Sequence, residues 1–179
     1  MNIEIRPATV RDVRDIHRLV NEYAQGGLLL GRSLNELYEG VRDLLVAVSD
    51  GVVIGCCALK VCWEDLAEVQ SLAVDRAYHG HGLGRRLVET ALRRAAELGI
   101  DTVFALTYQT EFFARCGFVI IDRERLPHKV WGQCVHCPKF PDCDESAMVY
   151  WAHGEPVANT AEKLGVPPLT PRVAPASEK

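Results

Sequence analysis

A glycine-rich turn stands between a β-rich run and a helical run in the middle of the chain. The turn reads His79-Gly80-His81-Gly82-Leu83-Gly84-Arg85 and follows residues 67–74. A strand that feeds such a turn and then a helix brings backbone N–H groups and the positive end of the helix dipole together. The turn therefore predicts a phosphate-binding site. The alternative is a strand–helix connection whose glycines serve only the backbone conformation.

The spacing of the glycines excludes two common nucleotide-binding motifs. A dinucleotide fingerprint needs a third glycine three positions after the second, and Arg85 occupies that position. A P-loop needs Gly-Lys followed by Ser or Thr, and the turn does not contain this pattern. The sequence therefore favours a phosphate-bearing ligand outside these two classes.

A second group with possible chemistry is a cysteine cluster. Cys134, Cys137 and Cys143 lie close together, and C-x2-C spacing is typical of zinc sites. A structural zinc site needs four ligands, so a nearby His128, His136 or Asp144, or a distant residue, would have to complete it. Structural zinc would fold the cysteine-rich insertion 127–145 without a catalytic role. The other interpretation is a proline-stiffened loop with free thiols.

The elements that position these residues follow from hydrophobic periodicity. Alternating or β-branched runs predict strands, and apolar residues at helical spacing predict helices. A helix N-cap is expected at Thr9, a capping box at Ser33 and Glu36, a hairpin turn at Asp50-Gly51 and a helix stop at Gly99. The strands are expected at 3–7, 44–48, 52–59, 67–74, 102–107, 118–121 and 147–151, and the helices at 10–24, 33–41, 83–98 and 111–115.

Length and composition predict one globular domain. The 179 residues are 48% hydrophobic and 25% charged, which is ordinary for a soluble protein. We expect the domain over residues 1–152 and a proline-rich, disordered tail over 153–179. The net charge of -4 argues against nucleic acid as a partner. Without a membrane-spanning run or a signal peptide, a cytoplasmic protein with reduced thiols is expected.

The glycine-rich turn resembles the pyrophosphate-binding signature of the GNAT superfamily of N-acetyltransferases, Gln/Arg-x-x-Gly-x-Gly/Ala. Both glycines match, and His79 departs from the first position. Segments 5–9 and 112–118 resemble the opening and a late helix–turn–strand of the same family, so the resemblance covers about residues 2–152. It implies an α/β (α+β) GNAT acyltransferase fold, with a mixed central sheet of about six to seven strands and helices on both faces.

More narrowly, segments 67–74, 107–115, 129–131 and 137–141 are similar to short bacterial amino-acid N-acetyltransferases of the N-acetylglutamate synthase type. This resemblance implies acetyl-CoA as acetyl donor, L-glutamate as acceptor and a place in arginine biosynthesis. The partners would be these small molecules, and a homodimer is compatible with the sequence. Two alternatives stay open: an acetyltransferase for another small amine or a protein N-terminus, and a non-catalytic regulatory protein that binds acetyl-CoA or metal.

The resemblance also implies roles for particular residues. Strand residues Leu72, Ala73 and Val74 would offer backbone groups to the pantetheine arm and the thioester. The pyrophosphate would be held by His79, Gly80, His81, Gly82, Leu83, Gly84 and Arg85.

Glu68 is the candidate base, because many relatives keep a carboxylate there that takes a proton from the amine through water. A solvated strand carboxylate is the alternative. Phe113 stands where relatives often have a tyrosine and cannot donate a proton, so Tyr108 is the candidate acid; a core tyrosine, with water as the donor, is the alternative.

A dicarboxylate acceptor needs fixed positive charge. Arg32 lies in the loop that lines the acceptor side in this superfamily, and Lys60 and Arg115 are further candidates. Surface solvation is the alternative for each of these side chains.

Overall fold

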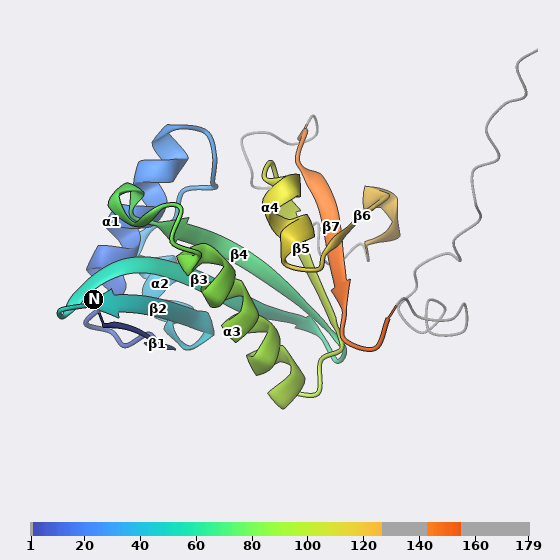
Figure 1. Ribbon diagram of the computed structural model, residues 1–179, viewed down its shortest axis with the longest axis horizontal. Helices are drawn as coiled ribbons and strands as arrows, with labels where there is room; N and C mark the ends of the chain where they lie inside the picture. Colours follow the sequence, from blue (N-terminus) through green and yellow to red (C-terminus); the bar gives the residue numbers. More distant parts are fainter. Residues whose placement is uncertain (1, 127–142, 155–179) are drawn as a thin grey trace, which may run out of the picture.

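A single mixed sheet organises the protein. The computed structural model describes residues 2–126 and 143–154 (Figure 1). Its seven strands stand in the order β1-β2-β3-β4-β5-β7-β6, and all neighbours are antiparallel except β4 and β5. The strands are β1 (Ile3–Pro7), β2 (Leu44–Ser49), β3 (Val52–Trp63), β4 (Leu66–Val74), β5 (Thr102–Thr107), β6 (Val119–Ile121) and β7 (Ser146–Trp151).

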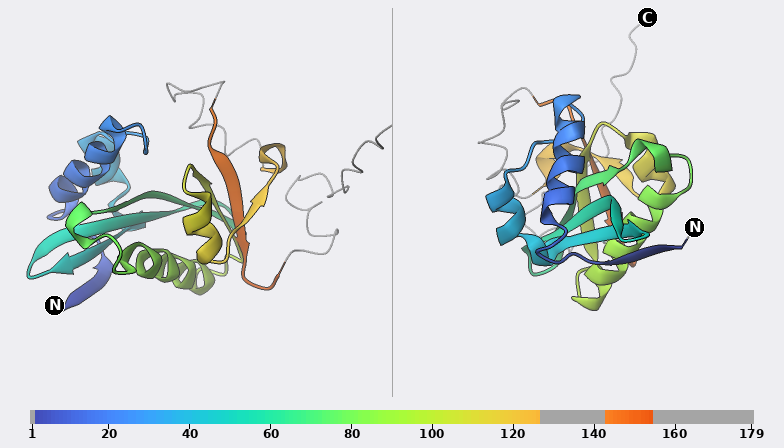
Figure 2. Two further views of the ribbon diagram at one scale, coloured as in Figure 1. Left: turned by 45° about the horizontal axis from the view of Figure 1, so that its top comes forward. Right: turned by 90° about the vertical axis from the view of Figure 1, so that its left-hand side faces the viewer.

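Helices cover both faces of this sheet (Figure 2). Four of them are α1 (Val13–Gln25), α2 (Leu34–Glu39), α3 (Leu83–Glu97) and α4 (Thr110–Arg115). On one face, α1 and α2 pack their apolar residues against β2, β3 and β4. On the other face, α3 packs on the opposite side chains of the same strands, and α4 packs beside β6 and β7. The predicted mixed sheet with helices on both faces is confirmed.

The parallel pair β4–β5 separates part of the way along its length. Within the described strands, the two are paired from Leu66 opposite Thr102 to Glu68 opposite Phe104. Beyond this point β4 continues to Val74 and β5 to Thr107. Because the backbone groups beyond Glu68 are not used between these strands, the sheet opens there into a V-shaped gap between two central strands.

Several local predictions are confirmed. Ser33 and Glu36 form the reciprocal capping box at the start of α2. Asp50 and Gly51 both have positive φ, at 50° and 80°, as a two-residue type I′ hairpin requires. Gly99 follows the end of α3 with φ 77°, the left-handed conformation that closes many helices.

The prediction of Thr9 as the N-cap of the first helix is wrong. The helix begins at Val13 with Asp12 as its N-cap residue. Thr9 instead donates two hydrogen bonds to the Asp12 carboxylate, from N at 2.7 Å and from Oγ1 at 2.9 Å. Arg6 adds a bidentate pair, Nη1 to Oδ2 at 2.8 Å and Nη2 to Oδ1 at 2.9 Å. A carboxylate with this many donors determines the turn more strongly than a threonine cap.

Two predicted regions lie mainly outside the described residues. These are the cysteine-rich insertion 127–145, of which 143–145 are described, and the tail 153–179, of which 153–154 are described. The domain boundaries therefore stay predictions. Across residues 2–126 and 143–154, every helix is too short or too polar to cross a membrane.

The partly buried ion pair between Arg6 and Asp12 at the start of α1 gives a prediction for stability against pH. The Arg6 guanidinium lowers the pKa of Asp12 to about 2, with help from Thr9. A lowered pKa contributes stability above the unfolded-state pKa, and this stability is lost as pH falls toward 2. We expect Asp12→Ala to lower the free energy of unfolding by about 2 kcal/mol at pH 7 and by much less near pH 2.

Urea denaturation at several pH values measures this difference. Asp15→Ala is the control, because Asp15 lies in the first turn of the same helix without being part of this ion pair. An Asp12→Ala effect that is the same at pH 7 and near pH 2 would contradict the assignment of the pKa shift.

Candidate functional site

The larger of two neighbouring pockets lies in the gap between β4 and β5. Its volume is about 640 Å³. One wall is β4 from Val69 to Val74, and the opposite wall is the end of β5 together with α4. The glycine-rich turn closes one end, and the loop after α1 contributes two leucines. The turn and strand residues that line it are Val69, Gln70, Ser71, Leu72, Val74, His79, Gly80, Gly82, Leu83, Gly84 and Arg85.

The glycine-rich turn has the backbone geometry of an anion cradle. Gly80 and Gly82 have φ of 79° and 72°, and Gly82 is the N-cap of α3. The first helical hydrogen bond runs from Arg86 N to Gly82 O, so the N–H groups of Leu83, Gly84 and Arg85 have no partner within the helix. Gly84 lets α3 approach α4, because a Cβ there would lie 3.3 Å from the Phe112 ring. The turn can therefore present N–H groups and the helix dipole to a pyrophosphate.

His79 contacts the end of helix α1. The Tyr23 hydroxyl donates to the Val74 carbonyl at 2.5 Å and lies 2.6 Å from Nε2 of His79. Nε2 of His79 is also 2.9 Å from the same carbonyl. The histidine that departs from the signature thus ties the turn to β4 and α1. Tyr23 packs against the core on the α1 side of the sheet and also lines the larger pocket.

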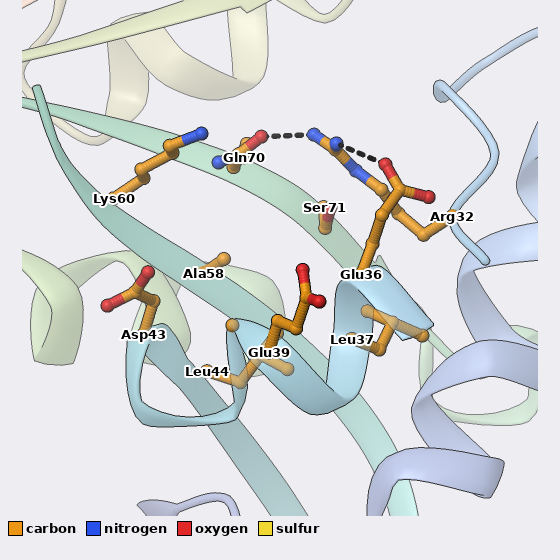
Figure 3. A pocket seen from close by; sticks show the side chains of 11 residues that line it. Arg32, Glu36, Leu37, Glu39, Asp43, Leu44, Ala58, Lys60, Gln70 and Ser71 are labelled. Carbon is orange, nitrogen blue, oxygen red and sulfur yellow. Dashed lines mark hydrogen bonds and ion pairs between the residues drawn. The ribbon is translucent and has the colours of Figure 1, made fainter. Parts of the chain in front are cut away.

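A smaller pocket of about 320 Å³ lies on the α1–α2 side of the sheet (Figure 3). Arg32 and Lys60 lie on either side of Gln70 along one wall. The opposite wall comes from α2 and the turn after it, and it carries Glu39 and Asp43. The other residues that line this pocket are Glu36, Leu37, Gly40, Leu44, Ala58 and Ser71.

Arg32 is held at the edge of the smaller pocket by two side chains. Its guanidinium donates from Nη2 to Oε1 of Gln70, and Nη1 lies 3.5 Å from Oε1 of Glu36. Only 14% of the Arg32 side chain is exposed. Gln70 is neutral, and Oε2 of Glu36 also accepts from N and Oγ of Ser33 at 2.8 and 2.7 Å. Glu36 therefore compensates the positive charge of Arg32 only in part, and the guanidinium can still bind an anion.

Glu68 lies at the point where β4 and β5 part. It is opposite Lys60 on β3 and opposite the fully buried Phe104 on β5. Loss of water contacts raises the pKa of Glu68 to about 7, although the charges of Arg32 and Lys60 act in the other direction. Alternation along β4 puts Glu68 on the same face as Gln70. A carboxyl group with a pKa near neutrality beside a pocket can accept and release protons at physiological pH.

The two pockets meet at Gln70 and Ser71, which line both of them. Ser71 has φ 52°, and together with Leu72 it stands opposite Cys57 alone, between the pairs Cys56–Ala73 and Ala58–Gln70. This β-bulge moves the following residues of β4 out of alternation. A left-handed serine is a strained conformation of the kind found at functional sites.

Some predicted residues lie elsewhere. Within the described residues, neither pocket includes Glu68 itself, Ala73, His81 or Tyr108. Ala73 packs under α1, and the hydroxyl of Tyr108 donates to Oδ1 of Asp144 at 2.5 Å. Arg115 lines the larger pocket, not the smaller one beside Arg32.

The zinc hypothesis is not tested by the described part of the chain. Cys134 and Cys137 lie outside the described residues. Cys143 is described, and its Sγ accepts from Nη2 of Arg123 at 3.0 Å. Among residues 2–126 and 143–154, no group of three or more His, Cys, Asp or Glu side chains is arranged to hold a metal ion.

Sequence reasoning missed Tyr23, Gln70 and Ser71. Gln70 could have been found by alternation, because it is two residues from Glu68 on one strand. The bulge at Ser71 could not have been predicted from the sequence, because serine is common both in strands and in turns. The role of Tyr23 depends on a contact across 51 residues of sequence.

Comparison with known proteins gives a family match. The model of the acetyltransferase (GNAT) family matches residues 13–118. An uncharacterized N-acetyltransferase of Chlorobaculum tepidum is 43% identical over 81% of this chain and 94% of its own length. An amino-acid acetyltransferase of Mycobacterium tuberculosis is 46% identical over 72% of this chain and 75% of its own length.

One similar solved structure is the N-acetylglutamate synthase of Neisseria gonorrhoeae, in complex with coenzyme A and N-acetyl-glutamate. The TM-score is 0.78 at 28% identity. The match covers 86% of this chain and 36% of that protein, so it concerns one part of a longer chain.

The position of Glu68 leads to a prediction for stability. Its folded-state pKa is raised, so the native protein holds the proton more tightly than the unfolded chain between about pH 4.5 and 7. The carboxylate therefore lowers stability as pH rises through this window, with the full effect above pH 7. We expect Glu68→Gln to raise the free energy of unfolding by about 1–3 kcal/mol at pH 8 and by little near pH 4.5.

Denaturant titrations of both proteins across this pH range measure the effect. Glu64→Gln is the matched control, since Glu64 is exposed in the turn between β3 and β4. Equal stability of wild type and Glu68→Gln at pH 8 would show that the pKa of Glu68 is not raised.

Proposed function

The chain belongs to the acetyltransferase (GNAT) family, and we propose that it transfers an acetyl group from acetyl-CoA to the α-amino group of L-glutamate. The observation that carries this proposal is the meeting of two pockets at Gln70 and Ser71. One pocket ends in an anion cradle, and the other contains two cationic side chains beside an ionisable carboxyl group. This arrangement suits a reaction between a phosphate-bearing donor and an anionic amine.

In this proposal acetyl-CoA occupies the larger pocket. The N–H groups at Gly80, Gly82 and Leu83 and the dipole of α3 hold its pyrophosphate. The edge of β4 that β5 leaves unpaired offers backbone groups to the pantetheine arm from Leu72 to Val74, except the Val74 carbonyl, which already accepts from Tyr23. A backbone N–H of this segment donates to the thioester oxygen and stabilises the negative charge that develops on it.

The acetyl group moves by direct attack of the amine on the thioester carbon. The α-ammonium group first loses a proton to the Glu68 carboxylate through water, because only the neutral amine is a nucleophile. The amine then forms the C–N bond, the C–S bond breaks, coenzyme A leaves as thiolate, and the nitrogen releases its second proton to water to become the neutral amide. Water supplies the proton to the thiolate, since Phe113 has none to give and Tyr108 donates its own to Asp144.

L-Glutamate is the proposed acceptor because the smaller pocket offers two cations to a molecule with two carboxylates. Arg32 and Lys60 provide them on the two sides of Gln70. The similarity to a protein named amino-acid acetyltransferase and to an N-acetylglutamate synthase supports the same choice. The product, N-acetyl-L-glutamate, would enter arginine biosynthesis.

A second candidate is an acetyltransferase for an amine with a neutral or cationic side chain. It is favoured by the acidic wall of the smaller pocket, where Glu36, Glu39 and Asp43 would repel a badly placed carboxylate. Both candidates use the same donor and the same base. They differ only in the side chain of the acceptor amine that faces this acidic wall.

One experiment separates the candidates: release of free thiol from acetyl-CoA, followed for the purified protein over a panel of amines. The panel contains L-glutamate, L-glutamine, L-lysine, L-ornithine and a peptide with a free N-terminus. The highest kcat/KM with L-glutamate supports the first proposal, and the highest value with a neutral or basic amine supports the second. Binding of acetyl-CoA without turnover of any amine contradicts both.

Removal of the proposed carboxylate-binding arginine tests the acceptor site. We expect Arg32→Ala to raise the KM for L-glutamate at least about tenfold, because a charge-assisted hydrogen bond contributes about 1.5–3 kcal/mol. The KM for acetyl-CoA should stay unchanged. Steady-state kinetics with each substrate varied in turn measure both values. Arg18→Ala, on the exposed side of α1, is the control, and an unchanged KM for glutamate would remove Arg32 from the site.

The proposed base gives a pH profile. With both substrates saturating, kcat of the wild type should rise with pH through about 7 as Glu68 loses its proton, and then level off. Glu68→Gln should lower kcat about 100-fold or more and remove this rise. Glu64→Gln should keep the wild-type profile. A wild-type profile retained in Glu68→Gln would assign the titration to another group.

A further inference from the structure

Asn21 binds the backbone of Arg32 in both directions. Its Nδ2 donates to the Arg32 carbonyl at 2.8 Å, and its Oδ1 accepts from the Arg32 N–H at 3.2 Å. Nδ2 also donates to the His17 carbonyl at 2.9 Å, one turn earlier in α1. The amide of Asn21 thus joins a rigid helix to the residue whose guanidinium lies at the smaller pocket.

The segment that carries Arg32 needs such an anchor. It follows α1 as Gly26-Gly27-Leu28-Leu29-Leu30-Gly31, and glycines give a chain more backbone freedom than other residues. Gln70 and Glu36 hold the guanidinium, but they do not fix the backbone from which the long side chain extends. An arginine on an unanchored backbone would have to be ordered when the ligand binds, and that ordering would weaken binding.

We infer that Asn21 is a positioning residue for the acceptor: its amide fixes the backbone of Arg32, so that the guanidinium meets the acceptor carboxylate already oriented. This inference rests on the proposed function, because it concerns how the acceptor is bound. Asn21 itself lines neither pocket within the described residues, so its effect passes through Arg32.

Gly31 supports the same arrangement. A Cβ at this position would lie 3.0 Å from Oδ1 of Asn21, the atom that accepts from the Arg32 N–H. A methyl group there would displace the amide without removing it. Gly31→Ala is therefore a second, independent way to loosen the anchor.

The first test compares substitutions at two neighbouring positions of α1, with a third as the control. Asn21→Ala should raise the KM for L-glutamate about five- to tenfold and change kcat and the KM for acetyl-CoA less than twofold. Tyr23→Phe removes a hydroxyl that touches β4 and the glycine-rich turn, so it should raise the KM for acetyl-CoA instead. Gln25→Ala removes an exposed amide from the end of α1 and should change neither.

A double-mutant cycle then asks whether Asn21 acts through Arg32. Asn21→Ala should have no further effect on the KM for glutamate when Arg32 is already alanine. Gly31→Ala should raise this KM by at least threefold in the wild-type background. Independently of turnover, amide hydrogen exchange at Arg32 should become at least tenfold faster in Asn21→Ala.

The outcomes separate two kinds of failure. If the wild type does not acetylate L-glutamate, the proposed acceptor and the role of Asn21 in binding it are both overturned. If the wild type is active but Asn21→Ala leaves the KM for glutamate unchanged, the positioning role alone is overturned. A general structural role would follow from either of two results. One is that Asn21→Ala lowers kcat and raises the KM values for both substrates by similar factors. The other is that its effect on the KM for glutamate adds to that of Arg32→Ala.

Discussion

The parting of β4 and β5 after Glu68 is the constraint on which the rest of the site depends. A fully paired sheet would use the backbone groups of both strands and leave no space between them. Because pairing stops at Glu68 and Phe104, an unpaired backbone edge, a pocket and a titratable carboxyl group come together at one place. The remaining elements close this opening: the glycine-rich turn at one end, α4 along one wall and the loop after α1 above it.

The electrostatics of the site follow from where Glu68 stands in the sheet. Its neighbour on β5 is a fully buried phenylalanine, and its neighbour on β3 is a lysine. The apolar side removes water and favours the protonated form, whereas Lys60 and Arg32 favour the charged form. The balance leaves Glu68 with a pKa near neutrality. A solvated strand carboxylate or a carboxylate in a tight ion pair would have a lower pKa.

Much of the fold could be predicted because its signals are local. The capping box at Ser33, the Asp50-Gly51 hairpin and the glycine-rich turn each depend on neighbouring residues, and all three occur as expected. The site was harder to predict because its decisive contacts are long-range. Tyr23 reaches the end of β4, and a bulge at Ser71 interrupts the alternation that strand patterns assume. At the start of α1, a partly buried ion pair replaced the threonine cap that a short motif favoured.

Gln70 and Ser71 belong to the walls of both pockets, and this shared wall has a consequence for how acceptor preference can change. In the proposed function, a substitution at either residue alters the surroundings of donor and acceptor together. By contrast, α2 and the turn after it carry Glu36, Glu39 and Asp43. These three residues line the smaller pocket and not the larger one. If the two pockets bind donor and acceptor as proposed, divergence or redesign toward a new amine can proceed from the helical side, residue by residue, while the donor pocket stays unchanged.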